Sequence, residues 1–209
     1  MILHGYWRST AAYRVRIALA LKGLRYEQVN HDLRTGAQRD AAYLTLNPQG
    51  LVPALALDEQ VFMQSGAIIE LLDELHPVPP LLPATPAGRA TARAMAAVIG
   101  ADIHPVNNLR IVNALREDFG ADERQVQAWI ARWIGEGFAA LEPQIVGPFA
   151  LGDAPGLVDC FLVPQVYHAE RFGVDLSAFP RLVAAAEHAR ALAACQAAHP
   201  AAQPDADPA

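Results

Sequence analysis

Five of ten consecutive residues are proline in the segment Pro77-Val78-Pro79-Pro80-Leu81-Leu82-Pro83-Ala84-Thr85-Pro86. Proline fixes φ and lacks a backbone N–H, so this segment cannot form a helix and acts as a stiff spacer. The sequence patterns on its two sides differ. We therefore place a domain boundary here and predict two domains, one at residues 1–80 and one at residues 87–209.

The chain before the boundary alternates strand and helix patterns in the order βαβ–α–ββα. Short apolar runs mark the strands, and apolar residues at helical spacing mark the helices. This order predicts a small α/β domain. The expected strands are residues 1–7, 24–29, 52–57 and 60–63, and the expected helices lie between Thr10 and Gly23, at residues 36–45 and at residues 65–76.

The chain after the boundary is rich in alanine and shows no strand pattern of any length. We therefore expect an all-α second domain, with an interruption of its first helix at Pro105. Residues 199–209 are rich in Pro, Ala and Asp, which predicts a frayed terminus. The expected helices are residues 87–118, 122–142, 156–172 and 180–197.

Composition excludes several classes of function. The 209 residues include 16 Lys and Arg against 22 Asp and Glu, a net charge of -6, without basic runs. This argues against nucleic acid or an anionic membrane as a partner. No stretch reaches the ~18 apolar residues of a membrane span, and the N-terminus lacks the apolar core of a signal peptide.

Motifs for metal or nucleotide chemistry are missing from the sequence. The seven histidines are scattered, and neither a P-loop nor a GxGxxG motif occurs, so we expect no metal site. The two cysteines, Cys160 and Cys195, lack CxxC spacing and sit in apolar helical stretches. We expect them to be inert core residues of a protein in the reducing cytoplasm.

The first candidate site lies at the junction of the first strand and the first helix. Arg8, Ser9 and Thr10 occupy this junction, where a helix N-terminus offers N–H groups and the positive end of its dipole. A hydroxyl there can donate to a bound anion such as a thiolate. The alternative is a simple helix cap.

Two further positions suit a peptide-like ligand. A cis bond between Val52 and Pro53, which we expect, would leave the Val52 backbone able to pair with an extended peptide, whereas the alternative is an ordinary edge-strand proline. Gln64 and Ser65 begin the next helix, where a hydroxyl and an N–H suit a carboxylate or merely cap the helix.

Taken together, these segments resemble one family, the zeta-class glutathione transferases. The resemblance covers nearly the whole chain. The segments that carry it are Trp7-Arg8-Ser9-Thr10-Ala11-Ala12-Tyr13-Arg14-Val15-Arg16-Ile17-Ala18-Leu19, Asn47-Pro48-Gln49-Gly50-Leu51-Val52-Pro53, Gln64-Ser65-Gly66-Ala67-Ile68-Ile69-Glu70, Asp102-Ile103-His104-Pro105-Val106-Asn107-Asn108-Leu109-Arg110 and Leu162-Val163-Pro164-Gln165-Val166.

The resemblance implies a thioredoxin-like domain with a glutathione site, an all-helical domain with a substrate site, and a homodimer. It implies that the Ser9 hydroxyl contacts the glutathione sulfur, with Thr10 in the same loop. It assigns the peptide part of glutathione to the remaining residues: Val52 and Pro53 to the cysteinyl backbone, Gln64 and Ser65 to the γ-glutamyl carboxylate, and Gln38 to the glycyl end.

The implied reaction is the glutathione-dependent cis–trans isomerisation of a small dicarboxylate, maleylacetoacetate or maleylpyruvate. The family often has a cysteine where this chain has Ala11, so the thiol must come from glutathione itself. A second departure is Gly156, which replaces the usual Ser or Thr cap and is tolerable at that position. Two alternatives stay open: a general transferase acting on electrophiles such as α-haloacids, and a non-catalytic glutathione-binding protein.

Arginines are the candidates for binding the two carboxylates. Arg8 in the first domain and Arg171 in the second are each expected to bind one carboxylate by a guanidinium fork, and Arg110 is a further candidate. The alternative for all three is an exposed side chain that is solvated or salt-bridged. His104 and Asn108 share a helix face unless Pro105 breaks it, and they either contact substrate or form a structural polar pair.

Overall fold

The computed structural model describes residues 1–207. Their contacts form two compact units: the first is Met1–Leu81 together with the segment from Arg190 onward, and the second is Leu82–Ala189. The sequence analysis assigned residues 190–209 to the helical domain, but residues 190–207 pack with the first unit, and residues 208–209 lie outside the described chain. In the described chain, no helix has the length and apolar character needed to cross a membrane.

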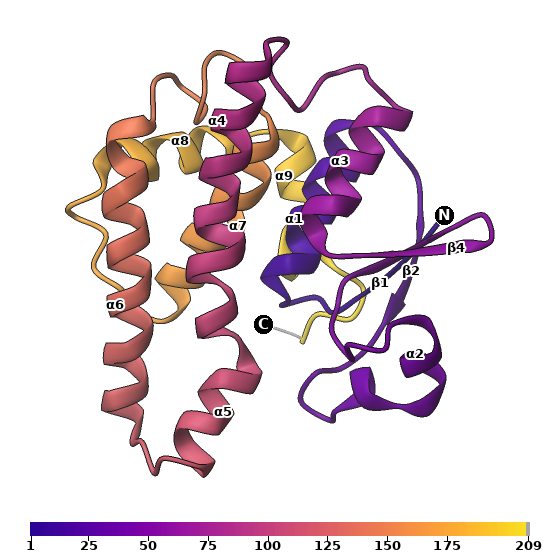
Figure 1. The fold of residues 1–209 in the computed structure, drawn as a ribbon, viewed down its shortest axis with the longest axis vertical. Helices are drawn as coiled ribbons and strands as arrows, with labels where there is room; N and C mark the ends of the chain where they lie inside the picture. Colours follow the sequence, from indigo (N-terminus) through magenta and orange to yellow (C-terminus); the bar gives the residue numbers. More distant parts are fainter. Residues whose placement is uncertain (208–209) are drawn as a thin grey trace. The chain divides into compact units, whose positions relative to one another are not determined.

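A four-stranded sheet forms the centre of the first unit (Figure 1). Its order is β2-β1-β3-β4, in which β1 pairs parallel with β2 and β3 pairs antiparallel with both β1 and β4. This mixed sheet confirms the α/β domain predicted from the sequence. The strands are β1 (Ile2–Gly5), β2 (Glu27–Asn30), β3 (Ala54–Leu57) and β4 (Gln60–Met63).

Helices cover both sides of this sheet. The helices α1 (Thr10–Leu21) and α3 (Ser65–Leu75) pack against each other, while α2 (Ala41–Leu46) lies across the strands from them (Figure 1). α1 also contacts α9 (Ala193–Ala198), which is why the C-terminal segment belongs to this unit. Short turns of 3-10 helix, η1 (Ala37–Arg39) and η5 (Pro200–Ala202), complete the unit.

Local sequence signals explain where these elements begin and end. The Ser9 side chain caps α1 by accepting the Ala12 N–H, and Gly23 follows the helix with a φ of 64°. The β3–β4 hairpin turns at Asp58, whose φ is 53°. The Val52–Pro53 bond is cis, as expected from the sequence.

The second unit consists of helices, as predicted. They are α4 (Pro86–Ala97), α5 (Leu109–Glu117), α6 (Glu123–Leu141), α7 (Leu157–Arg171) and α8 (Pro180–Arg190), with the π segment η2 (Val98–Ile103) and the 3-10 turns η3 (Pro105–Asn107) and η4 (Glu142–Gln144). Gly156 precedes α7 as its cap, and its N–H donates to the carboxylate of Asp159. That side chain, 3% exposed, also accepts the Ala150 N–H.

Three expected helices are interrupted in the structure. The stretch at residues 36–45 divides at Asp40, whose backbone is extended, into η1 and α2. The stretch at residues 87–118 leaves α-helical geometry at Val98 and is interrupted at Pro105 as expected, where η3 begins. Between these two positions, Ile103 packs directly on α6. A Cβ on Gly137 would lie only 2.3 Å from the Cδ1 of Ile103, so only glycine permits this approach. The stretch at residues 180–197 divides into α8 and α9, separated by residues 191–192.

The expectation of a frayed terminus is wrong for residues 199–207. The buried Gln203 side chain donates from Nε2 to the carbonyl oxygens of Ala197 and His199, at 3.0 and 2.9 Å, which folds the segment back on α9. Asp205 and Asp207 then bind residues of the N-terminal half of the unit. Composition does not reveal the contacts of Asp205 and Asp207, because they join residues 198 and 173 positions apart.

Lys22, the only lysine of the chain, anchors the proline-rich segment to the first unit. Its buried Nζ donates to the carboxylate of Asp73. It also donates to the carbonyl oxygens of His76 and Pro79, at 2.6 Å each. Asp73 also accepts the Leu81 N–H at 2.8 Å. The buried ammonium therefore has an oxygen acceptor for each of its three protons.

Replacing Lys22 should destabilise the protein strongly. Lys22→Met leaves the Asp73 carboxylate and two carbonyls without their donor, and removing one partner of a buried ion pair costs about 3–5 kcal/mol. Arg124→Met changes an exposed basic residue and should stay within about 0.5 kcal/mol. Urea unfolding of the three proteins measures both values, and a Lys22→Met protein as stable as the control would contradict this role.

Candidate functional site

The register of the sheet brings the predicted glutathione-site segments to one edge of the first unit. His4 of β1 pairs with Ala54 of β3, which in turn pairs with Met63 of β4. The ends of β1 and β4 and the beginning of β3 therefore lie side by side. The loops that continue from them carry Ser9, the Val52–Pro53 bond and Gln64.

Ser9 and Thr10 form the N-terminus of α1. The Ser9 Oγ accepts the Ala12 N–H at 3.2 Å, which is the capping role that the sequence analysis gave as the alternative. A cap uses a lone pair of the oxygen, so the hydroxyl proton can still be donated to an anion. Thr10 is buried, and Arg8 is half-buried with its guanidinium 5.0 Å from the Trp7 ring centre.

Two buried side chains hold the loop that leads into Val52. The Leu51 carbonyl accepts the Tyr43 hydroxyl at 2.6 Å and the Asn47 Nδ2 at 2.7 Å. Burial raises the pKa of Tyr43, which keeps the phenol protonated and able to donate. Asn47 also accepts the Gln49 N–H at 3.0 Å. Both residues therefore determine where the Val52 backbone lies.

Neither of these loop-holding residues was among the predicted site residues. Asn47 was named only within a segment that carries the family resemblance, and Tyr43 lay only within an expected helix. The available signal was the Asn-Pro pair, since an asparagine side chain readily binds backbone two residues ahead. The bond from Asn47 to Leu51 reaches further and needs the folded loop.

Gln64 and Ser65 lie at the N-terminus of α3. Gln64 has a φ of 69°, an uncommon backbone conformation for a residue other than glycine, and such positions gather at ligand sites. Its Nε2 donates to Gln49 Oε1 at 3.0 Å. The buried Ser65 Oγ accepts from Arg14 Nη1 at 3.3 Å, and burial lowers the pKa of Arg14 to about 9. That arginine therefore remains a cation at neutral pH.

Gln38 lies beside the same loop. It belongs to η1, and a Cβ built on Gly50 would approach its carbonyl oxygen to 3.2 Å. Its side-chain Oε1 is buried and has no hydrogen-bond partner in the described structure. A buried acceptor without a donor is costly, so this atom marks a place where a ligand donor fits.

The other predicted residues lie in the second unit. His104 ends the π segment, and Asn108 has an extended backbone and caps α5 by accepting the N–H groups of Arg110 and Ile111. The two do not share one helix face, because Pro105 starts a separate turn. Arg110 is exposed, and Arg171 stacks its guanidinium 4.7 Å from the Phe172 ring centre at the end of α7.

Comparison with known proteins identifies the family. The model of the glutathione S-transferase N-terminal domain matches residues 3–80. A maleylacetoacetate isomerase of Pseudomonas aeruginosa is 53% identical over 98% of each chain. A solved maleylpyruvate isomerase, described as a bacterial glutathione transferase of the zeta class, is 48% identical with a TM-score of 0.97, over 99% of this chain and 100% of that one. The chain belongs to the zeta-class glutathione transferases.

A second solved structure is a maleylacetoacetate isomerase of Methylobacterium extorquens AM1 with bound malonate and glutathione. It is 38% identical with a TM-score of 0.95 and covers all of both chains. This membership confirms the fold class expected from the sequence, a thioredoxin-like domain followed by helices. In this zeta-class chain, the described residues contain no group of three or more His, Cys, Asp or Glu arranged to hold a metal ion.

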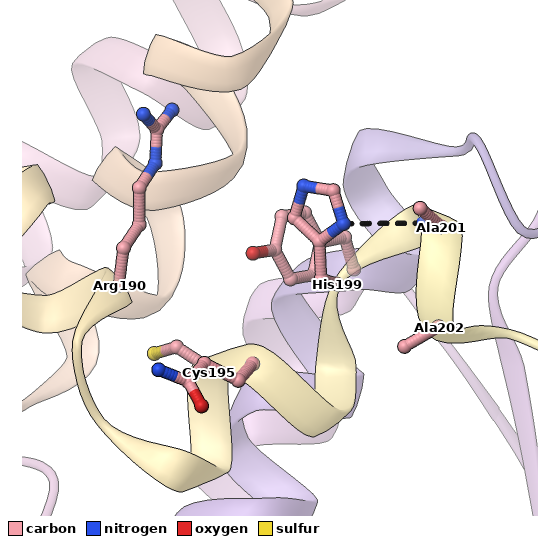
Figure 2. A pocket seen from close by; sticks show the side chains of 7 residues that line it. Arg190, Cys195, His199, Ala201 and Ala202 are labelled. Carbon is pink, nitrogen blue, oxygen red and sulfur yellow. Dashed lines mark hydrogen bonds between the residues drawn. The ribbon is translucent and has the colours of Figure 1, made fainter. Parts of the chain in front are cut away.

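A hollow of about 370 Å³ elsewhere on the first unit is distinct from these loops (Figure 2). It is lined by Tyr13 of α1 and by residues of α9 and η5. Figure 2 shows His199 among the lining side chains, with Nδ1 accepting the Ala201 N–H at 3.2 Å. None of the predicted site residues lines this hollow.

Proposed function

We propose that this protein is a glutathione-dependent cis–trans isomerase acting on maleylacetoacetate or maleylpyruvate. The observation that carries the proposal is the near full-length similarity to isomerases of both substrates. Within the first unit, the loops at Ser9, Val52 and Gln64 meet at one edge of the sheet. Their chemistry suits a peptide that carries a thiol and carboxylates.

Several groups of this chain fit the peptide part of glutathione. We assign Val52, before the cis Pro53, to the cysteinyl backbone, and Gln64 with Ser65 to the γ-glutamyl carboxylate. The buried cation of Arg14 behind Ser65 favours an anion there. Gln38, whose buried Oε1 lacks a donor, is assigned to the glycyl end.

Glutathione supplies a thiol that adds as a thiolate to the cis double bond, permits rotation about the resulting single bond, and leaves again. This chain places Ala11 at the position where relatives often have cysteine, and Cys160 and Cys195 are buried. Ser9 donates its hydroxyl proton toward the sulfur, and the N-terminal dipole of α1 favours the anion. Thr10 lies in the same loop.

Arginines bind the two carboxylates of the substrate in this proposal. Arg8 directly precedes Ser9 in the same loop, and Arg171 presents a planar guanidinium at the end of α7. Arg110 and His104 are secondary candidates, whereas Asn108 already caps α5. Positive groups near the substrate carbonyl also stabilise the negative charge that develops when the thiolate adds.

The remaining partners follow from the family and the composition. We propose a homodimer located in the cytoplasm, in keeping with two buried cysteines that form no disulfide. We propose no metal, membrane or nucleic-acid partner.

The proposal is tested by mixing purified protein with each maleyl substrate and following the loss of its enol absorbance. We expect turnover only when glutathione is present, because no side chain at the site supplies a thiol. We also expect a metal chelator to leave the turnover unchanged, because the mechanism uses no metal. Full activity after removal of all thiols would refute the mechanism. Glutathione binding without turnover would favour a carrier, and turnover of α-haloacids alone would favour a general transferase.

Asn47 should affect glutathione rather than the maleyl substrate. Asn47→Ala removes one of two donors to the Leu51 carbonyl, and losing a hydrogen bond of about 1–1.5 kcal/mol should raise the KM for glutathione about five- to tenfold. Thr45→Ala, an exposed neighbour on α2, serves as the control. An unchanged KM in a folded Asn47→Ala protein would remove Asn47 from the site.

Arg171 should affect the maleyl substrate rather than glutathione. Arg171→Ala removes a charge-assisted fork of roughly 1.5–3 kcal/mol and should lower kcat/KM about tenfold to a hundredfold. Arg171→Lys should recover only part, because a point charge does not reproduce the fork. Arg181→Ala, another exposed arginine of this unit, should match the parent. Parental kcat/KM in Arg171→Ala would shift the assignment to Arg110 and His104.

A further inference from the structure

The loop from Tyr6 to Ser9 has its backbone held by groups far away in the sequence. The Trp7 N–H donates to Asp205 Oδ2 at 2.9 Å, and the Trp7 carbonyl accepts from Arg16 Nη2 at 2.9 Å. The Tyr6 carbonyl accepts the Ser9 N–H at 3.0 Å and lies 3.4 Å from Arg16 Nη1. This loop ends at the hydroxyl that we place beside the glutathione sulfur.

The same arginine reaches the C-terminal segment. Arg16 is 1% exposed, and its Nε donates to the carbonyl of Ala198, the last residue of α9, at 3.0 Å. One buried guanidinium therefore joins α9 to the Tyr6–Trp7 backbone. A planar, rigid donor set fixes three carbonyls relative to one another, which a lysine could not do.

Residues 198–205 are themselves folded into a defined shape. Gln203 is buried and donates to two carbonyls at the end of α9. The turn η5 connects the end of α9 to Gln203. Asp205, half-buried, accepts from Gln28 Nε2 of β2 at 3.2 Å as well as from Trp7. The carboxylate thus has two donors that orient it toward the loop.

We propose that residues 198–205 form a C-terminal strap that positions the Ser9 hydroxyl, with Asp205 and Arg16 as positioning residues. This inference rests on the proposed function of Ser9. Asp205 accepts the N–H of Trp7, two residues before Ser9, and Arg16 donates to the carbonyls of Tyr6 and Trp7. Losing the strap therefore lets the hydroxyl move away from the sulfur, while the loops that hold the peptide part of glutathione stay in place.

Asp205→Ala tests the strap with less risk to folding than a change at the buried Arg16. Asp205→Asn keeps an oxygen that can accept the Trp7 N–H. Asp207→Ala is the matched control, because Asp207 is exposed and its carboxylate binds Arg34 instead of the loop. Ser9→Ala gives the effect of losing the hydroxyl itself. Every variant is measured at 25 °C after its melting temperature has been shown to lie well above that.

Three measurements are made. Hydrogen exchange at the Trp7 amide of the ligand-free protein should speed up about tenfold in Asp205→Ala, because its acceptor is lost. The thiol of bound glutathione, followed by its thiolate absorbance, should titrate at a higher pH, as in Ser9→Ala. kcat should fall about threefold to tenfold with the KM for glutathione within about twofold of the parent, because small misplacements of a reacting group cost rate. Asp205→Asn should recover most of each change.

The outcomes separate the strap from the proposed function. Unchanged exchange at Trp7, or faster exchange with an unchanged thiol titration and kcat, overturns the strap. A parent protein that binds glutathione but isomerises neither maleyl substrate refutes the proposed function, while the thiol titration still decides the strap. A parent protein that binds no glutathione refutes both. Asp207→Ala behaving like Asp205→Ala would also overturn the role of Asp205, since the loss would then belong to the whole terminus.

Discussion

The antiparallel pairing of β3 with both β1 and β4 is the constraint on which the site of the first unit depends. The pairs His4 to Ala54 and Ala54 to Met63 place three strand ends at one edge. Because a shift of one residue in a strand turns every side chain to the opposite face, the buried Leu3 and Leu55 keep this register in place. The loops that leave this edge therefore meet without long connections.

Three buried cations on or next to helix α1 hold neighbouring segments of the first unit in place. Lys22 at its end holds the proline-rich segment, Arg16 holds the loop before Ser9 and the end of α9, and Arg14 reaches Ser65 on α3. Burying a cation is costly unless it is paired, and the partners of these three include carbonyls, a hydroxyl and a carboxylate. Each cation fixes the position of one segment relative to α1 by directional hydrogen bonds, which apolar contacts alone would not do.

Sequence patterns predicted what depends on neighbouring residues. The strands, the cis Val52–Pro53 bond, the Ser9 cap and the Gly156 cap all follow from local rules and are present in the structure. What the patterns did not predict needs the folded chain. The change from α to π geometry at Val98, near which Ile103 packs on Gly137, has no local signal, and Gln203 and Asp205 order a terminus whose composition predicts fraying.

Local electrostatics explains how an acidic chain suits anionic ligands. The net charge of -6 repels glutathione and a dicarboxylate at long range, but salt screens this field beyond about 8 Å. Near the sheet edge, the N-termini of α1 and α3 each present a positive dipole end. The buried Arg14 adds a full positive charge behind Ser65. Burial lowers the pKa of Arg14 to about 9, so this charge is kept at neutral pH. A few oriented groups therefore outweigh the surface charge where we propose that glutathione binds, and these groups lie in the part of the fold that the sheet register determines.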